Sequence, residues 1–352
     1  DNISSSFTGC FNEGPWYDES FGADIISKHI GVENHKVPIT ASSFASTVDE
    51  VIHALDGPRM GIGAVSQYLV ASKAAEHSRV ILTGHGGDEL FSGYPVYKFA
   101  NMLASFEQRP LSLVNQLRGL KPTEFANLLY FALGTISSHE RKYFLPVLQS
   151  LNQLRDILSD RAKRHLGDFQ LTNSLQQLRA KTDSPNSYVS RLYMEEYLHG
   201  LLIIEDKVSM AHSLESRTPF LDNELVSLSN TIHPDVKLHG GLLKAVIKAL
   251  GSELLPKEIK EFPKRGFPTP LRIWLRGPLK KWAEARILSE NCSLESIFCK
   301  NKIHALWQGY QLSSMRHVRP LDEIQTFKIW QLISLESWLR QLRCRYGINM
   351  YL

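Results

Sequence analysis

The first hundred residues alternate between short apolar segments and longer amphipathic ones. Strands are expected over residues 5–11, 35–39 and 79–83, and helices over 18–30, 42–55 and 63–76. Asp18 is the expected N-cap of the first helix. Strands that alternate with helices at this spacing predict an α/β protein with a doubly wound parallel sheet. Ligands of such sheets bind beyond the carboxyl ends of the strands.

The pattern becomes helical after residue 100. Residues 101–190 are polar and helical, and residues 191–352 are strongly helical apart from a turn at 217–222 and a loop at 257–271. The last expected helix carries apolar residues at helical spacing, which favours a place in the core. We therefore predict an α/β part over 1–100, a helical insert over 101–190 and a helical remainder over 191–352.

A glycine-rich turn follows the third expected strand. The apolar run Val80–Leu82 predicts a buried parallel strand, and Thr83, Gly84, His85, Gly86 and Gly87 then lead into Asp88 and Glu89 at a helix start. Backbone N–H groups at such a helix start attract anions. Two carboxylates would repel a bound phosphate unless a divalent cation bridges them, so a magnesium nucleotide is one interpretation. A glycine turn with ordinary acidic capping is the other.

Four segments resemble the asparagine synthetase family in the family's order. Residues 79–94, RVILTGHGGDELFSGY, resemble its S-G-x-G-x-D-E-x-F-x-G-Y signature, and residues 6–11 with 17–19 resemble its second strand and following helix. Residues 206–222 resemble its D-x-x-S-M-A-x-S-x-E-x-R-x-P-F-L-D block. Lys244, residues 255–256, residues 264–271 and Trp274 resemble its K…L-P…K-x-G-F-x-x-P-L…W tail. The family fold implied is adenine nucleotide alpha hydrolase-like, with its first strand missing here.

The resemblance implies an ATP-dependent, AMP-forming amide ligase that activates a carboxylate as an acyl-adenylate. ATP and Mg²⁺ are the implied cofactors, and aspartate with ammonia from a glutaminase domain or chain is the default substrate pair. Nucleotide contacts fall on Gly9, Thr83, Gly84, Gly86, Gly87 and Lys244. Asp88 is the implied metal ligand, and Lys244 either touches phosphate or faces solvent.

Lys264 is the expected catalytic cation, because a lysine in a glycine-containing, partly desolvated loop can stabilise the charge of the reacting adenylate. Arg217 is expected to form a buried bidentate ion pair with Glu215 or Asp222 that shapes the site wall. Asp206 is expected to have either a structural or a catalytic role. Glu89 is assigned to the site wall as well.

Two departures from the family pattern bear on function. The family's diphosphate loop, S-G-G-x-D-S, and its glutaminase domain are absent from these residues. Both are expected upstream in a parent polypeptide, and the alternative is a degenerate, inactive relative. His85 stands where asparagine-forming members usually have glutamate and lactam-forming members can have tyrosine. It could act as a base near neutral pH or only hydrogen-bond phosphate.

Composition narrows the class of protein. The chain has 352 residues, 43% of them hydrophobic and 22% charged, which is ordinary for a soluble globular protein. Its net charge of +4 suits a small anionic substrate, and no basic stripe indicates nucleic acid. No apolar run reaches a membrane span of about 20 residues. Four cysteines without metal-site spacing predict free thiols and a cytoplasmic location.

Three functions remain open at this point. The first is the synthetase part of a glutamine-dependent asparagine-forming amidotransferase, the second is a macrolactam or β-lactam-type ligase, and the third is a scaffold protein that keeps the fold without catalysis. A homodimer is compatible with each of them.

Overall fold

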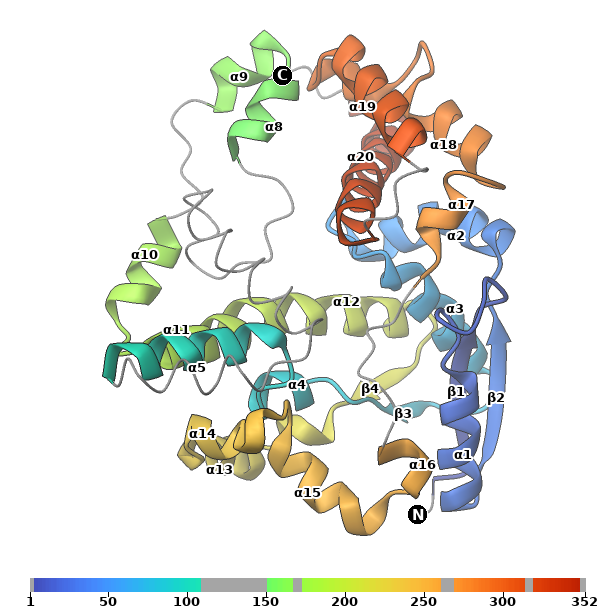
Figure 1. The fold of residues 1–352 in the computed structure, drawn as a ribbon. Helices are drawn as coiled ribbons and strands as arrows, with labels where there is room; N and C mark the ends of the chain where they lie inside the picture. The colour runs from blue at the N-terminus through green and yellow to red at the C-terminus, as the bar shows by residue number, and fades with distance from the viewer. Residues whose placement is uncertain (1–2, 109–150, 167–172, 261–268, 314–318, 349–352) are drawn as a thin grey trace.

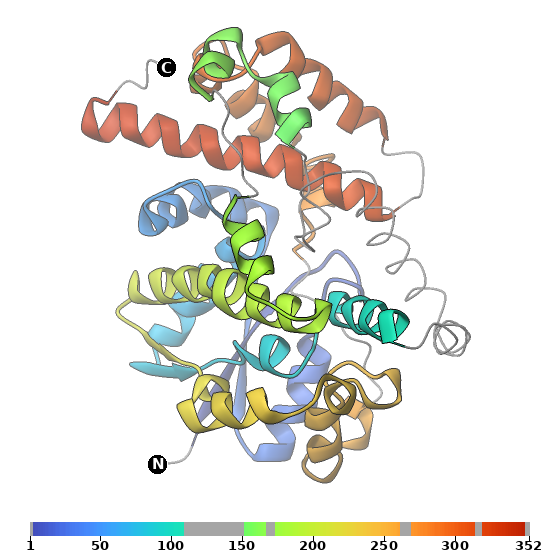
Figure 2. The ribbon, with the colours of Figure 1, turned by 90° about the vertical axis from the view of Figure 1, so that its left-hand side faces the viewer.

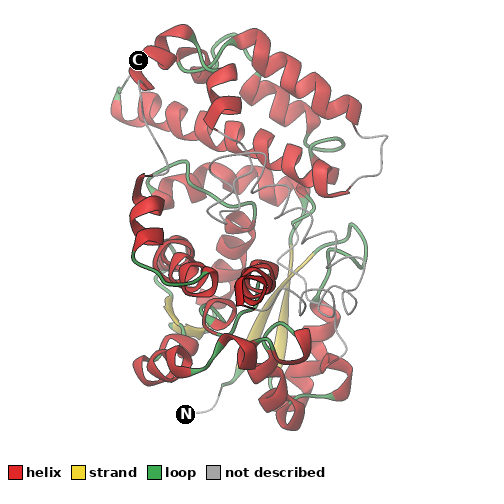
Figure 3. Cartoon of the chain, turned by 60° about the vertical axis from the view of Figure 1, so that its left-hand side comes forward, coloured by secondary structure: helices red, strands yellow, loops and turns green. Residues whose placement is uncertain are grey.

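The computed structural model describes residues 3–108, 151–166, 173–260, 269–313 and 319–348. Its strands lie together in one half of the molecule, and the other half is helical (Figure 3). The N-terminus lies at the strand-containing end and the C-terminus at the helical end (Figure 1). None of the helices in these segments is long and apolar enough to cross a membrane.

The α/β part begins with the expected alternation. Its elements in order are β1 (Ser5–Cys10), α1 (Ser20–Ile30), β2 (Glu33–Pro38), α2 (Ala41–Leu55), α3 (Gly63–Ala75), β3 (Val80–Leu82) and α4 (Gly87–Leu90). The prediction of an α/β protein with parallel strands is confirmed. Each expected helix is present with ends shifted by one or two residues.

The middle of the chain is helical. It contains α5 (Pro95–Gln108), α8 (Leu151–Ile157), α9 (Asp160–Leu166), α10 (Asn173–Ala180), α11 (Pro185–Leu192), the π-helix η2 (Tyr193–Tyr197) and α12 (Leu198–Met210). Much of the predicted insert lies outside the described residues, so the three-part division stays a prediction.

One short strand and a series of helices complete the chain. They are β4 (Glu215–Arg217), η3 (Pro219–Leu221), α13 (Asn223–Thr231), α14 (Pro234–Lys237), η4 (His239–Gly241), α15 (Ala245–Leu254), α16 (Lys257–Lys260), α17 (Leu271–Trp274), α18 (Lys280–Ile287), η5 (Ser293–Ser296), α19 (Lys300–Leu312) and α20 (Arg319–Tyr346). Figure 2 shows α20 as a long rod across the helical end.

The described strands form two separate parallel pairs. β1 pairs with β2, with Phe7 opposite His35, and β3 pairs with β4, with Ile81 opposite Ser216. Phe7 and Ile81 nevertheless pack into one small cluster with Ala71 and Ala74 of α3 and with Leu214. Helix α3 therefore supports both pairs.

The expected burial of β3 is wrong for two of its three side chains. Val80 is 37% and Leu82 is 56% exposed, although Ile81 is half-buried. Parallel strands are normally covered on both faces. Val80 and Leu82 alternate with Ile81, which packs on the α3 cluster, so they lie on the opposite face, and the described segments leave that face uncovered.

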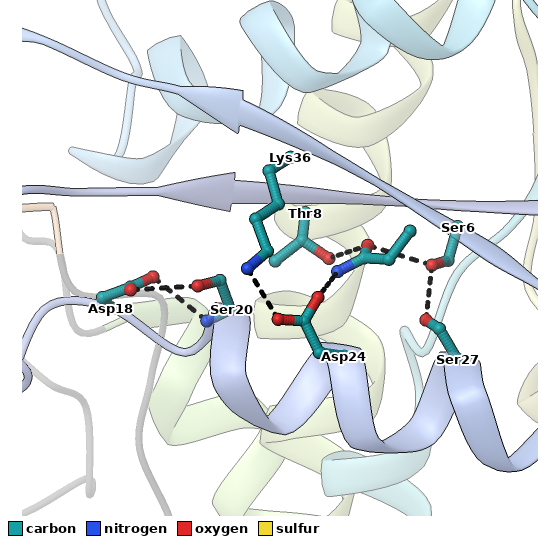
Figure 4. A network of polar contacts seen from close by, with 8 residues as sticks. Ser6, Thr8, Asp18, Ser20, Asp24, Ser27 and Lys36 are labelled. Carbon is teal, nitrogen blue, oxygen red and sulfur yellow. Dashed lines mark hydrogen bonds and ion pairs between the residues drawn. The ribbon is translucent and has the colours of Figure 1, made fainter.

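The packing of α1 on β1 and β2 is polar, unlike most helix–sheet contacts. The Asn34 side chain accepts hydrogen bonds from Ser6 and Thr8 and donates to Asp24 of α1 at 2.8 Å. Lys36 pairs with Asp24 at 2.6 Å (Figure 4). Alternation along each strand places these polar groups opposite the face that carries the Phe7 and His35 rings, which stack at 5.1 Å.

The start of α1 differs slightly from the prediction. Glu19 occupies the N-cap position and makes no side-chain capping bond. Asp18, the expected cap, still accepts a hydrogen bond from the Ser20 backbone N–H at 3.0 Å (Figure 4). The prediction that Asp18 is the N-cap is therefore wrong by one residue, although its carboxylate does accept a backbone N–H at the helix start.

The main core lies between α2, α17, α18 and α20. Phe44, Trp274 and Trp330 form its centre, with Phe44 5.2 Å from Trp274 and 5.4 Å from Trp330 between ring centroids. The predicted apolar stripe of the last helix is confirmed as core, since Ile333 and Leu339 are buried in the same cluster.

Candidate functional site

The glycine turn after β3 has the geometry that its sequence predicts. Gly86 adopts φ +90°, which side chains rarely permit, and Gly87 then begins α4. A Cβ on Gly86 would lie 2.8 Å from Cγ of Leu221, so the turn also needs glycine for close packing. Thr83 continues the strand by donating its N–H to the Arg217 carbonyl at 2.9 Å.

The long block at 206–222 packs against this turn. β4 pairs with β3, and the Phe220 ring lies 3.4 Å from where a Cβ on Gly87 would be. Phe220 also contacts Phe91, the aromatic residue that follows α4, at 6.3 Å between centroids. Two of the four resembling segments, distant in sequence, therefore meet at one place.

His85 lies at the middle of the turn. Its Nδ1 shares a 3.1 Å hydrogen bond with the Thr83 hydroxyl, and both side chains are half-buried. This bond restrains the ring above the turn. A hydrogen-bonded imidazole at this position can exchange a proton with a bound amine or contact a phosphate.

Asp88 is held by a lysine. Its Oδ1 lies 3.1 Å from Nζ of Lys244, and the two side chains are 26% and 29% exposed. Lys244 precedes α15 with φ +55° and donates its backbone N–H to the Ser92 carbonyl at 3.4 Å. The two contacts expected for Lys244 were phosphate or solvent, and its contact in this structure is Asp88.

Glu89 is buried beside tyrosine side chains that the sequence analysis did not single out. It is 3% exposed and accepts a 2.6 Å hydrogen bond from the Tyr94 hydroxyl. Tyr97 donates to the Glu89 carbonyl at 3.0 Å, and Tyr193 and Tyr197 pack on Tyr94. Burial and the Glu89 carboxylate raise the pKa of Tyr94 well above its usual range, so it remains a donor. The sequence signal for Tyr94 is its place at the end of the 79–94 segment, whereas Tyr97, Tyr193 and Tyr197 have none.

The ion pair expected at Arg217 is only partly correct. Arg217 Nε contacts Glu215 Oε1 at 2.8 Å, but the side chains are 63% and 56% exposed, so the pair is neither buried nor bidentate. Asp222 instead caps α13 by accepting from the backbone N–H groups of Glu224 and Leu225. Glu215 and Arg217 lie opposite Val80 and Leu82 on the exposed face of the β3–β4 pair, which leaves their side chains in water.

Asp206 is exposed on α12, and its neighbour Glu205 takes the inward position. Glu205 is 8% exposed and accepts a 2.9 Å hydrogen bond from Ser216 of β4. Glu205 lies on the buried face of α12 and links the helix to β4, whereas Asp206 lies on the exposed face.

The remaining predicted residues are placed as follows. Gly9 is buried near the carboxyl end of β1, in the other strand pair. Lys264 lies outside the described residues. The four cysteines are free thiols, as expected. In the described segments no group of three or more His, Cys, Asp or Glu side chains could hold a metal ion. Asp88 fits Mg²⁺ only as a single carboxylate ligand that leaves other positions to phosphate and water, which is usual for Mg²⁺.

The sequence of the chain is similar to those of known proteins. The asparagine synthase family model matches residues 3–340. A Mycobacterium tuberculosis protein provisionally named asparagine synthetase (glutamine-hydrolyzing) is 28% identical over 94% of the chain and 50% of its own length. Asparagine synthetase (glutamine-hydrolyzing) 1 of Bacillus subtilis is 26% identical over 88% of the chain and 49% of its length. Amidase chry2 of Gibberella zeae is 21% identical over 78% of the chain and 45% of its length.

The chain spans about half the length of these curated relatives. The family match extends over both strand pairs, the glycine turn and most of α20, and so includes the site and the core that supports it. The chain belongs to the asparagine synthase family.

Proposed function

We propose that this chain is the synthetase part of an ATP-dependent amide ligase that forms AMP and pyrophosphate. The observation that carries the proposal is the meeting of the glycine turn with the 217–221 segment at the carboxyl end of β3. That place is where doubly wound proteins bind ligands. The family match supports the same class of reaction.

The roles of the chain's own groups follow from their positions. Backbone N–H groups of the turn would hold phosphate oxygens, and Asp88 would hold Mg²⁺. Bound Mg²⁺ would neutralise charge between carboxylate and phosphate. Lys244, adjacent to Asp88, is close enough to contact a phosphate held there. Lys264 stays the predicted cation that stabilises the charge of the reacting adenylate.

We further propose that another strand completes the sheet between β1 and β3 and carries the diphosphate loop. This proposal is supported by Phe7 and Ile81, which pack on the same small cluster, the one that contains Ala71 and Ala74 of α3. Val80 and Leu82 are exposed in a parallel strand, where a complete sheet would bury them. Polypeptide beyond the residues described would supply this strand.

Aspartate and ammonia are the proposed substrates. His85, restrained by Thr83, would take the proton from the incoming amine. The histidine also supports the second candidate, a ligase that joins another acid and amine, because the family's asparagine-forming members usually carry a carboxylate at this position. Relatives named amidase are compatible with that alternative.

The test is to co-express the chain with a segment that carries the proposed strand and diphosphate loop and to measure pyrophosphate release with ammonium as the amine. We expect release that depends on aspartate. Pyrophosphate release that does not depend on aspartate but requires another acid would support the second candidate. No release with any acid would contradict the ligase proposal and favour a scaffold.

A further inference from the structure

The Asp88–Lys244 ion pair occupies the place where the proposed function puts a metal ion. The pair is only about one-quarter exposed, with 3.1 Å between Asp88 Oδ1 and Lys244 Nζ. A carboxylate that must bind a divalent cation is therefore already neutralised by a cation of the same chain.

Gly93 fits closely against both members of the pair. Its N–H donates to the Asp88 carbonyl at 2.7 Å. A Cβ on Gly93 would overlap Asp88 Oδ1 and would lie 2.6 Å from Cε of Lys244. The backbone that follows α4 thus wraps around the pair and holds the two charged groups together.

The backbone at this point adopts an uncommon conformation. Ser92 and Lys244 have φ of +57° and +55°, and they are joined by the Lys244 N–H to Ser92 carbonyl hydrogen bond. Residues other than glycine rarely adopt this left-handed region, and such outliers cluster at functional sites. With this backbone conformation, the Lys244 side chain lies against Asp88.

We propose that Lys244 is a tethered counter-ion that exchanges Asp88 for a phosphate when the metal nucleotide binds. Without nucleotide, a metal ion must displace the ammonium from Asp88, so metal alone binds weakly. With nucleotide, a phosphate receives the ammonium and frees the carboxylate. Metal and polyphosphate would therefore bind cooperatively. The polyphosphate draws away the ammonium that competes with the metal, and the metal releases that ammonium from Asp88 to contact the phosphate. This inference rests on the proposed function of the same site.

The exchange predicts effects of opposite sign in one variant. In Lys244→Met the competitor of the metal is gone, so Mn²⁺ should bind Asp88 about 5- to 10-fold more tightly in the absence of phosphate. The same variant should bind ATP more weakly in the presence of EDTA, because a phosphate contact is lost. If Lys244 had only a structural role, Lys244→Met would neither tighten Mn²⁺ binding nor weaken ATP binding in EDTA.

The experiment measures free Mn²⁺ by electron paramagnetic resonance with this chain, and ATP binding with a fluorescent ATP analogue in EDTA. Lys244→Arg keeps the charge and should bind Mn²⁺ no more tightly than the wild type. Lys28→Met removes an exposed lysine from α1 and is the matched control. Asp88→Asn locates the metal, and circular dichroism confirms that each variant is folded.

The outcomes separate the inference from the proposed function. Tighter Mn²⁺ binding in Lys244→Met that is lost when Asp88→Asn is added, together with weaker ATP binding, supports the exchange. Equal Mn²⁺ affinity in wild type and Lys244→Met, with sensitivity to Asp88→Asn, overturns the exchange and leaves the metal site intact. If Asp88→Asn leaves the Mn²⁺ affinity unchanged in every variant, both the exchange and the proposed metal site are overturned.

Discussion

At the scale of single residues, the candidate site depends on close approach of backbone to charge. Gly93 leaves room for Asp88 and Lys244, and Gly86 leaves room for Leu221. His85 is held by one hydrogen bond to Thr83. These contacts make the geometry of the turn sensitive to the addition of a single methyl group.

Gly93→Ala should weaken both the fold and the site. The new Cβ would overlap the Asp88 carboxylate and press on Lys244, and overpacking of this kind costs about 1–3 kcal/mol. Urea unfolding and Mn²⁺ binding measure the two effects. Gly57→Ala is the control, because a Cβ there meets nothing within 4 Å. Equal stability and Mn²⁺ affinity in the two variants would contradict the assigned packing.

His85→Gln should change how the ligase responds to pH. Glutamine can keep a hydrogen bond with Thr83 but cannot accept a proton near neutral pH. If His85 is the base, the wild-type rate should depend on pH, and the variant should lose that dependence. Rates are measured between pH 5 and 9 in the completed protein. Identical pH profiles would reject the base role.

At the scale of elements, the glycine turn and the start of α4 were predictable because local backbone chemistry fixes them. The exposure of β3 was not, because burial of a strand depends on neighbours that the local pattern does not specify. The same reason explains why the Arg217–Glu215 pair lies in water. The tyrosines near Glu89 come from the residue before α5, from α5 itself and from η2, and their meeting depends on tertiary packing.

Leu82→Glu should distinguish the chain alone from the completed protein. Leu82 is 56% exposed, so the substitution should change stability of the chain alone by at most about 0.5 kcal/mol. In the completed protein the side chain at position 82 would be buried. The rate of ATP consumption that requires the carboxylic acid substrate should therefore fall in the variant. Leu312→Glu on α19, where leucine is 79% exposed, should be neutral in both. Full activity of Leu82→Glu in the completed protein would contradict the proposed strand.

At the scale of the whole molecule, an ion cluster joins segments that are distant in sequence. Arg286 of α18 forms two hydrogen bonds with Asp49 of α2, at 2.9 and 3.0 Å, and Arg340 of α20 also contacts this carboxylate. The apolar stripe of α20 was predictable from helical spacing. A contact between residues 49 and 340 was not, because charge pairing leaves no periodic signal in sequence.

Asp49→Asn should destabilise the chain by about 1–3 kcal/mol at pH 7, because two arginines lose their carboxylate. Burial raises the pKa of Asp49, but the guanidinium groups of Arg286 and Arg340 outweigh burial and hold it below its usual value. The stabilisation should therefore be complete above about pH 4 and be lost as pH falls through the lower folded-state pKa. Urea unfolding from pH 7 to pH 3 tests this.

The control for that experiment is Asp56→Asn. Asp56 also pairs with a lysine, Lys207, but its side chain is 78% exposed. Exposed pairs contribute about 0–1 kcal/mol, so the effect should be small at every pH. If Asp49→Asn lowers the free energy of unfolding no more than Asp56→Asn does, the cluster does not hold the helices together. The same conclusion follows if the loss in Asp49→Asn is as large at pH 3 as at pH 7.

We propose that the completed protein activates a carboxylate as an acyl-adenylate. The direct measurement supplies ¹⁸O-labelled aspartate, ATP, Mg²⁺ and ammonium and analyses the nucleotide product by mass spectrometry, with Lys264→Met as a variant whose rate should be ~100-fold lower. We expect AMP that carries one ¹⁸O atom from the acid. Formation of ADP with ¹⁸O in inorganic phosphate, or of AMP without the label, would contradict it.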